Sequence, residues 1–364
     1  MPRLNAFLEL GRNQGASDVH LAVGVPPMVR VLGAMKPVKY RALDRDELES
    51  LVDEILTDEQ RRIFSDGNDI DFSYADPDVG RFRANVYRKL SGVGATFRVI
   101  PHQMPTLDDL GHPPVLKRLT EHSHGMVLVT GATGTGKTTT LAAMINHMNI
   151  TRRLNIITLE DPVEFLHESK QSLVVQREIG TSAASFQDGL RAALREDPDV
   201  ILVGELRDPE TISMAMTAAE TGHLVLGTLH TTTATKTIDR IIDVMPTEMK
   251  QQAQVFLSQH LRGVVSQRLV RTADKNSRRA VLEIMLNSPA IGNLILNGKV
   301  FQIPSQIQTG RDKGMQLMDQ TLMQAILNKE LDPDDAYLNA DDKKQFQRFV
   351  TDPDLLPQVS LAGV

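Results

Sequence analysis

Residues 125–140 read GMVLVTGATGTGKTTT, an apolar run followed at once by glycines, a lysine and threonines. Gly131, Gly136, Lys137 and Thr138 fill the fixed positions of the pattern G-x-x-x-x-G-K-[ST]. The pattern stands between a predicted strand and a predicted helix, LAAMINHMN. The glycines permit torsions that aim backbone N–H groups at phosphate oxygens, and the helix N-terminus adds a partial positive charge. This stretch therefore predicts a phosphate-binding loop.

The loop predicts a role for its polar residues. We expect Lys137 to bridge the β- and γ-phosphates of ATP and the Thr138 hydroxyl to hold Mg²⁺. The expected nucleotide-binding residues are Gly131, Thr133, Gly134, Thr135, Gly136, Lys137, Thr138 and Thr139. A glycine-rich turn with a chance lysine is the alternative, and the flanking strand and helix argue against it.

An NTPase of this kind needs an acidic group beside the phosphates, and the stretch VILVGELRD supplies one. Four apolar residues are followed by Gly204, where an aspartate is usual, and then by Glu205. We expect Glu205 to orient or deprotonate the attacking water, or to hold Mg²⁺ through water. A solvated carboxylate at a strand end is the alternative.

A second acidic pair, Glu160 and Asp161, ends the apolar run NIITLED. Carboxylates at the carboxyl end of a parallel strand lie beside the nucleotide crevice. Glu160 is therefore a second catalytic candidate, and the choice of proton acceptor between Glu160 and Glu205 stays open. Asp161 could instead cap a following helix.

Two histidines, His223 and His230, bracket the predicted strand LVLGTL. His230 is expected at the carboxyl end, near the phosphates, where it could sense the γ-phosphate or couple neighbouring subunits. A structural role is the alternative for His230 and the preferred one for His223. With no cysteine and no H-E-x-x-H spacing, a zinc site is not indicated.

Short apolar runs alternate with helical patterns between residues 125 and 230, which predicts a parallel sheet covered by helices on both faces. From about residue 236 the chain is expected to be mostly helical, with amphipathic helices over 249–269 and 314–329. We therefore predict an α/β fold with an ATPase core over 116–270 and a helical region over 271–364.

The first hundred residues have a different pattern. Strands are expected at 17–24, 26–33, 69–76, 80–89 and 94–101. A helix is expected over 43–60, opened by Asp44 with Glu47 three positions on. Residues 1–102 are thus predicted to form a small α+β domain. Four prolines between 101 and 114 predict a linker over 103–115 that could act as a hinge.

The bulk composition excludes several classes of protein. The 364 residues carry a formal net charge of −6, which disfavours general attraction to nucleic acid. With no cysteine, the chain has no disulfide or thiolate metal site. No apolar run has the length of a signal peptide or a bilayer span. We expect a cytoplasmic protein, or one peripheral to a membrane through partners.

Taken together, GATGTGKTT, ITLEDPVEF, LREDPDVILVGELRD and TGHLVLGTLHT resemble the four nucleotide motifs of the secretion ATPase superfamily. The segments ASDVHLAVGVPPMVRVLG, GRFRANVYR and QIPSQIQTGRDKGMQLMDQTL narrow the resemblance to the retraction ATPases of type IV pili. It covers nearly the whole chain.

That resemblance implies ATP hydrolysis by a homohexamer with a PAS-like N-terminal domain and a RecA-like core. It places Arg83 and Arg98 as catalytic arginines that reach the nucleotide from the N-terminal domain. It also implies a pilus platform protein of the inner membrane as partner, and location at the inner face of that membrane. A basic, solvated sheet face is the alternative for the arginines.

One segment departs from the retraction pattern. Residues 290–297 read AIGNLILN where the family has AIRNLIRE, so an accessory role beside a paralogous retraction ATPase stays open. A pilus or secretion assembly motor is disfavoured, because assembly relatives carry an extra N-terminal domain and a four-cysteine zinc insertion. A nucleic-acid translocase, a small-molecule kinase and a nucleotide-switched scaffold are less favoured.

Overall fold

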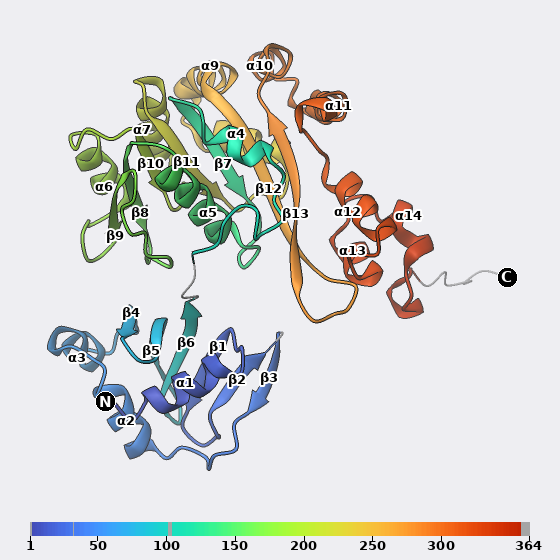
Figure 1. Ribbon diagram of the computed structural model, residues 1–364. Helices are drawn as coiled ribbons and strands as arrows, with labels where there is room; N and C mark the ends of the chain where they lie inside the picture. The colour runs from blue at the N-terminus through green and yellow to red at the C-terminus, as the bar shows by residue number, and fades with distance from the viewer. Residues whose placement is uncertain (1, 32, 101–103, 358–364) are drawn as a thin grey trace. The chain divides into compact units, whose positions relative to one another are not determined.

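The computed structural model describes residues 2–31, 33–100 and 104–357. Its chain forms two compact units (Figure 1). The N-terminal unit comprises Met1–Gln103 with Pro162–Phe165, and the core unit comprises Met104–Asp161 with Leu166–Val364. The predicted linker 103–115 begins at residue 103, which lies outside the described residues, as do residues 101 and 102 of the expected hinge.

The N-terminal unit is built on one antiparallel sheet of six strands, in the order β3-β2-β1-β6-β5-β4. Its strands are β1 (Asp18–Ala22), β2 (Met28–Val31), β3 (Ala34–Pro37), β4 (Ile70–Asp76), β5 (Gly80–Lys89) and β6 (Gly92–Ile100). Its helices are α1 (Asn5–Asn13), α2 (Arg45–Asp53) and α3 (Asp58–Ser65). Apolar side chains alternate along the central strands and pack with α1 and α2 in one core, so the other sheet face carries polar residues.

The single helix expected over 43–60 is wrong. Asp44 does cap α2 by accepting from the Glu47 amide, but α2 ends at Asp53. Thr57 and Gln60 form a capping box that starts α3. Because such a box satisfies two backbone donors at a new helix N-terminus, it favours two helices over one.

The core unit holds a sheet of seven strands in the order β13-β12-β7-β11-β10-β8-β9 (Figure 1). Its strands are β7 (Gly125–Thr130), β8 (Asn155–Glu160), β9 (Leu173–Glu178), β10 (Val200–Val203), β11 (Leu224–Leu229), β12 (Leu261–Arg271) and β13 (Arg278–Leu286). All pairs from β12 to β9 are parallel, and β13 pairs antiparallel with β12.

Helices cover both faces of this sheet, as predicted. Side chains from alternate positions of β7, β10 and β11 pack on α4 and α5 on one face and on α6 to α10 on the other. Of the remaining helices, α11 joins the second of these cores, and α12 to α14 form a separate apolar cluster with β12 and β13. The helices are α4 (Val115–Leu119), α5 (Lys137–Thr151), α6 (Phe186–Ala193), α7 (Pro209–Glu220), α8 (Ala234–Val244), α9 (Lys250–His260), α10 (Pro289–Leu296), α11 (Ile303–Thr309), α12 (Met318–Leu327), α13 (Pro333–Asn339) and α14 (Lys343–Phe346).

The amphipathic helix expected over 249–269 is wrong in its second half. Helix α9 ends at His260, and β12 begins at Leu261. Strand β12 lies between β7 and β13 and is largely buried, although its sequence LRGVVSQRLVR includes several polar residues. Its residues Leu261, Val264, Val265 and Leu269 stand at i, i+3, i+4 and i+8, so the apolar spacing indicates a helix. Strand β13 likewise extends the sheet into the region expected to be helical.

Candidate active site

The phosphate loop connects β7 to α5, as the sequence predicts. Gly131, Gly134 and Gly136 have φ angles of 149°, 79° and 88°, values that residues with a Cβ rarely adopt. A Cβ on Gly131 would overlap the carbonyl oxygen of Gln267, and one on Gly136 would lie 2.9 Å from Gln267 Nε2. The loop therefore needs glycine both for its torsions and for its approach to β12.

Lys137 is the first residue of α5 and is 9% exposed. Its ammonium donates to the carbonyl oxygens of Gly131 and Ala132, at 2.8 and 2.9 Å. The lysine thus folds back over the loop that it follows. Thr133 and Gly134 are exposed, whereas Thr135, Gly136, Thr138 and Thr139 are partly buried.

Behind the loop, a buried hydrogen-bond chain joins three side chains. Gln267 Nε2 donates to the Thr135 carbonyl at 2.6 Å, and Thr140 Oγ1 donates to Gln267 Oε1 at 2.8 Å. His112 Nε2 lies 2.9 Å from Thr140 Oγ1. The three side chains are 7% exposed or less. Burial, with a smaller contribution from Arg279, lowers the pKa of His112 to about 4.

The carboxylates lie at the same edge of the sheet as the loop. Strands β8, β10, β11 and β7 are parallel neighbours in register, so their carboxyl ends fall together. This edge carries Glu160 at the end of β8, Glu205 just after β10, His230 just after β11 and Gly131 just after β7. Residues spread over a hundred positions of the chain are thereby gathered beside one loop.

Glu205 lies between two cationic or titratable partners. Its Oε1 is 2.5 Å from Arg207 Nε and 2.8 Å from His230 Nε2. Burial favours the neutral acid, but the hydrogen bond and charge of Arg207, followed by His230, outweigh it and lower the pKa of Glu205 below its ordinary value. Glu205 is therefore ionised at neutral pH, as a general base or a metal ligand must be.

Glu160 is more deeply placed, with 8% of its surface exposed. Its Oε1 accepts from Thr158 Oγ1 at 2.6 Å and from Gln176 Nε2 at 3.1 Å. The expectation that Asp161 could cap a following helix is wrong, because β9 is the next regular element after β8.

The two histidines of β11 have different partners. His230 bonds Glu205 at the carboxyl end of the strand. At the opposite end, His223 Nδ1 lies 2.9 Å from the Ala218 carbonyl in α7. His223 thus holds the end of α7, which agrees with a structural role.

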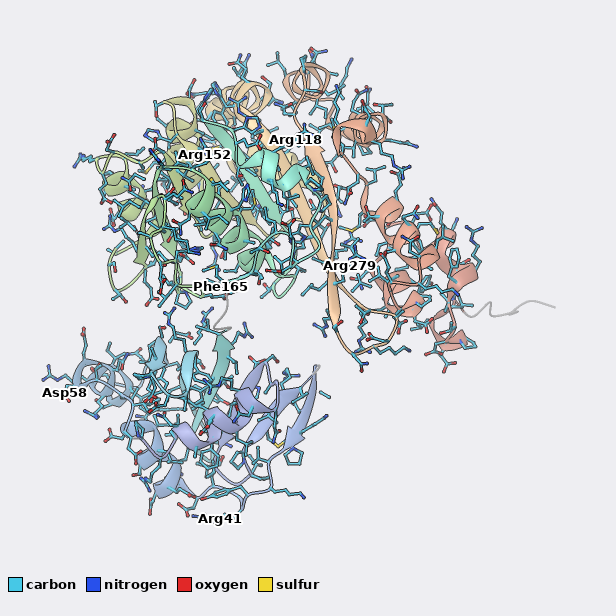
Figure 2. All side chains as sticks on the ribbon, viewed as in Figure 1. Arg41, Asp58, Arg118, Arg152, Phe165 and Arg279 are labelled. Atoms are coloured by element: carbon cyan, nitrogen blue, oxygen red, sulfur yellow. The ribbon has the colours of Figure 1, made fainter. Side chains whose placement is uncertain are left out.

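A cavity of about 440 Å³ adjoins the phosphate loop on the side of β12 and β13. It is lined by Gly136, Thr139, Thr140, His112 and Arg279, among others. Figure 2 shows Arg279, which comes from β13. The volume of the cavity and its contact with the phosphate loop suit the nucleoside part of a nucleotide whose phosphates occupy the loop.

Arg83 and Arg98 lie in the N-terminal unit, where the antiparallel register of β5 and β6 sets them directly opposite each other. Arg98 Nε is 3.0 Å from Asp18 Oδ1, and Arg83 Nε is 3.7 Å from Asp71 Oδ1. Their side chains are 57% and 35% exposed. Arg81 shares this sheet face and donates to Ser73 Oγ at 3.1 Å.

Comparison with known proteins supplies the family. Residues 57–356 match the model of the type II/IV secretion system protein family. The chain belongs to this family. It is 49% identical to the type IV pilus retractation ATPase PilT of Pseudomonas aeruginosa over 319 residues, which are 88% of this chain and 92% of that one. A twitching motility protein of Neisseria gonorrhoeae is 48% identical over 310 residues, 85% of this chain and 83% of that one.

A solved member of this secretion family has the same fold. The crystal structure of the pilus retraction motor PilT with bound ADP matches with a TM-score of 0.87 and 41% identity, covering 96% of this chain and 99% of that one. The predicted α/β fold and the resemblance to retraction ATPases are both confirmed.

Within this secretion-family chain, the segment that departs from the retraction pattern forms α10. A Cβ on Gly292 would lie 2.6 Å from the Ser258 carbonyl oxygen of α9. The glycine therefore lets α10 pack closely on α9, and an arginine would not fit that packing. Leu296, at the end of α10, is 47% exposed, and nearby Phe301 is 76% exposed.

Sequence reasoning missed three residues of this secretion-family site. Arg207 lies two residues after Glu205 in the stretch VILVGELRD, so its proximity to Glu205 could have been predicted from the sequence. Gln267 and His112 reach the loop from β12 and from the segment before α4, and no local pattern connects them to it.

Proposed function

We propose that this protein is a homohexameric motor that hydrolyses ATP to retract type IV pili and so drives twitching motility. One observation carries the proposal: a glycine-dependent phosphate loop and an ionised glutamate, Glu205, occupy the same edge of a parallel sheet. The names of the relatives at 49% and 48% identity support retraction as the use of that ATPase.

The loop would hold the triphosphate through backbone N–H groups, and Lys137 would leave its carbonyl partners to bind the β- and γ-phosphates. The Thr138 hydroxyl and the Glu205 carboxylate are the oxygen ligands that Mg²⁺ prefers, so they fit the ion. When bound, Mg²⁺ would neutralise charge that develops on the phosphates.

Glu205 would orient or deprotonate the attacking water. Arg207 and His230 contact its carboxylate and lower its pKa, and the contact with His230 connects Glu205 to the end of β11. Glu160, which Thr158 and Gln176 hold at the same edge, would support the water or the metal ligands. A base that is ionised at neutral pH contributes roughly 10²–10⁴-fold to such a reaction.

Arg83 and Arg98 would complete the site from an N-terminal unit of the ring. Binding of ATP would favour a closed arrangement and loss of phosphate an open one, so that turnover moves the two units relative to each other. The linker is the proposed hinge. The motion would act on an inner-membrane pilus platform protein, with a paralogous retraction ATPase as a further partner.

The protein would work in the cytoplasm, at the inner face of the inner membrane, through the pilus machinery. Among the described residues, no helix has both the length and the apolar character needed to cross a membrane.

The decisive experiment compares ATP hydrolysis by wild type, Lys137→Ala, Glu205→Gln and a control. Glu196→Gln is the matched control, because Glu196 also pairs with an arginine, Arg177, at 2.8 Å. We expect loss of nucleotide binding for Lys137→Ala, a fall in kcat of about 10²–10⁴-fold for Glu205→Gln, and wild-type rates for Glu196→Gln. Full activity of either of the first two contradicts the assignment.

A second measurement decides whether the motor retracts or assembles pili in the cell. A deletion strain that carries excess surface pili and cannot twitch supports retraction, whereas a strain without pili supports assembly. A deletion strain that twitches less but still retracts pili would indicate the accessory role.

A further inference from the structure

We propose that Gln267, oriented by Thr140 and His112, is the positioning residue that fixes the peptide planes of the phosphate loop. This inference rests on the proposed ATPase function and deepens it. Gln267 belongs to β12 and lies 131 positions beyond Gly136 in the sequence. It is 2% exposed.

The direction of every hydrogen bond in the buried chain is forced. A carbonyl oxygen can only accept, so the Thr135 carbonyl requires the Gln267 amide nitrogen on its side. Gln267 Oε1 then faces Thr140 and must accept the single hydroxyl proton of that threonine. Thr140 Oγ1 can therefore only accept from His112, and His112 Nε2 must carry a proton.

This chain sets the orientation of a functional peptide group. In a trans peptide the C=O and the following N–H point in opposite directions. When Gln267 holds the Thr135 carbonyl, the N–H of Gly136 is aimed away from Gln267, toward the hollow of the loop. That N–H is one of the donors a phosphate would need.

Gln267 also limits the loop sterically. A Cβ on Gly131 would overlap its backbone carbonyl oxygen, and a Cβ on Gly136 would lie 2.9 Å from its amide nitrogen. Both fixed glycines of the motif therefore pack on this one residue. The low pKa of His112 keeps its ring neutral at physiological pH, which agrees with a single Nε2–H donor.

The chain further connects the loop to the neighbouring cavity. His112, Thr140 and Gln267 all line the cavity of about 440 Å³ that suits a nucleoside. A ligand in that cavity would thus lie against the same residues that orient the phosphate donors, so base and phosphate binding are coupled through Gln267.

The first test is Gln267→Glu, which keeps the shape and the acceptor for Thr140 but places a carboxylate against the Thr135 carbonyl. We expect the Kd for ATP, measured by calorimetry, to rise about tenfold or more, because the Gly136 N–H is no longer held toward the phosphate and its hydrogen bond is weakened or lost. The kcat at saturating ATP should change by less than about threefold, because the reacting groups are intact.

Gln171→Glu is the control, since Gln171 also donates its amide to a backbone carbonyl, that of Ile150, at 2.7 Å but on the surface. It should bind ATP as wild type does. A wild type that binds no ATP overturns the proposed function and this inference together. A wild type that binds ATP equally with Gln267→Glu overturns the inference alone.

A second test does not depend on the fold tolerating a buried charge. His112→Gln retains a side-chain N–H for Thr140 and should keep the Kd for ATP within about twofold, whereas His112→Leu should raise it about fivefold. Nitrogen NMR of labelled His112 should show a protonated Nε2 and an unprotonated Nδ1 at pH 7. The opposite tautomer, or equal affinities of the two variants, overturns the proposal.

Discussion

The two sheets of this protein place functional side chains by different means. In the core unit, parallel strands end at one edge, so Gly131, Glu160, Glu205 and His230 meet because their strands share a direction. In the N-terminal unit, antiparallel strands set Arg83 opposite Arg98 within a sheet face. The parallel sheet thus gathers residues by topology and the antiparallel sheet by register.

We expect the arginine pair of the antiparallel sheet to serve the site at the edge of the parallel sheet. Removing the pair should have the strongest effect of the changes proposed. The double substitution Arg83→Gln with Arg98→Gln should lower kcat by about 10³-fold, because positioned guanidinium groups neutralise transition-state charge. Binding of ATP should change little. Both side chains are partly exposed, so the variant should fold, and Arg62→Gln on the exposed side of α3 is the control.

Rings assembled from two different variants show whether the arginines act on a neighbouring subunit. If the arginines act on a neighbouring subunit, rings mixed from the double variant and Lys137→Ala should regain part of the ATPase activity, since some interfaces then combine intact halves. Mixed rings as inactive as either parent would contradict action between subunits, and a double variant with wild-type kcat would return the arginines to a solvated sheet face.

The next effect concerns the stability of the core unit against acid. Folded His112 has a pKa of about 4, below the value near 6.5 of an unfolded histidine. Between these pH values the unfolded chain binds more protons, so stability falls as pH falls. We expect a loss of about 2 kcal/mol between pH 7 and pH 5 from this residue.

Urea unfolding at the two pH values measures that loss. His112→Gln, which cannot titrate there, should show a difference smaller by that amount. An unchanged difference would mean that His112 does not carry the acid sensitivity.

The smallest expected effect separates the two histidines of β11. His230→Ala should lower kcat roughly tenfold, because Glu205 loses a hydrogen-bond partner that orients its carboxylate. His223→Ala should leave kcat unchanged and lower the free energy of unfolding by about 1 kcal/mol, the size of one lost hydrogen bond. Steady-state kinetics with denaturant unfolding of both proteins checks the pair, and equal kcat values would refute a catalytic role for His230.

Local patterns predicted much of the fold. The alternation of apolar runs with helical stretches predicted the order of β7, α5, β8, α6, β10, α7 and β11, because each buried strand is a short apolar run between turn residues. The same signal failed for β12, whose apolar residues fall at helical spacing, and for β9, whose apolar run is short. The break between α2 and α3 depended on a capping box at Thr57.

By itself the sequence determined that this chain has a phosphate loop after one strand, acids after two others and the motifs of a secretion-family ATPase, because each of these depends on residues adjacent along the chain. Only the tertiary structure decided that His230 holds Glu205, and that Gln267 lies beneath Gly131 and Gly136. Such contacts join strands far apart in sequence, and sheet order and register, which no local spacing encodes, bring them within hydrogen-bond distance.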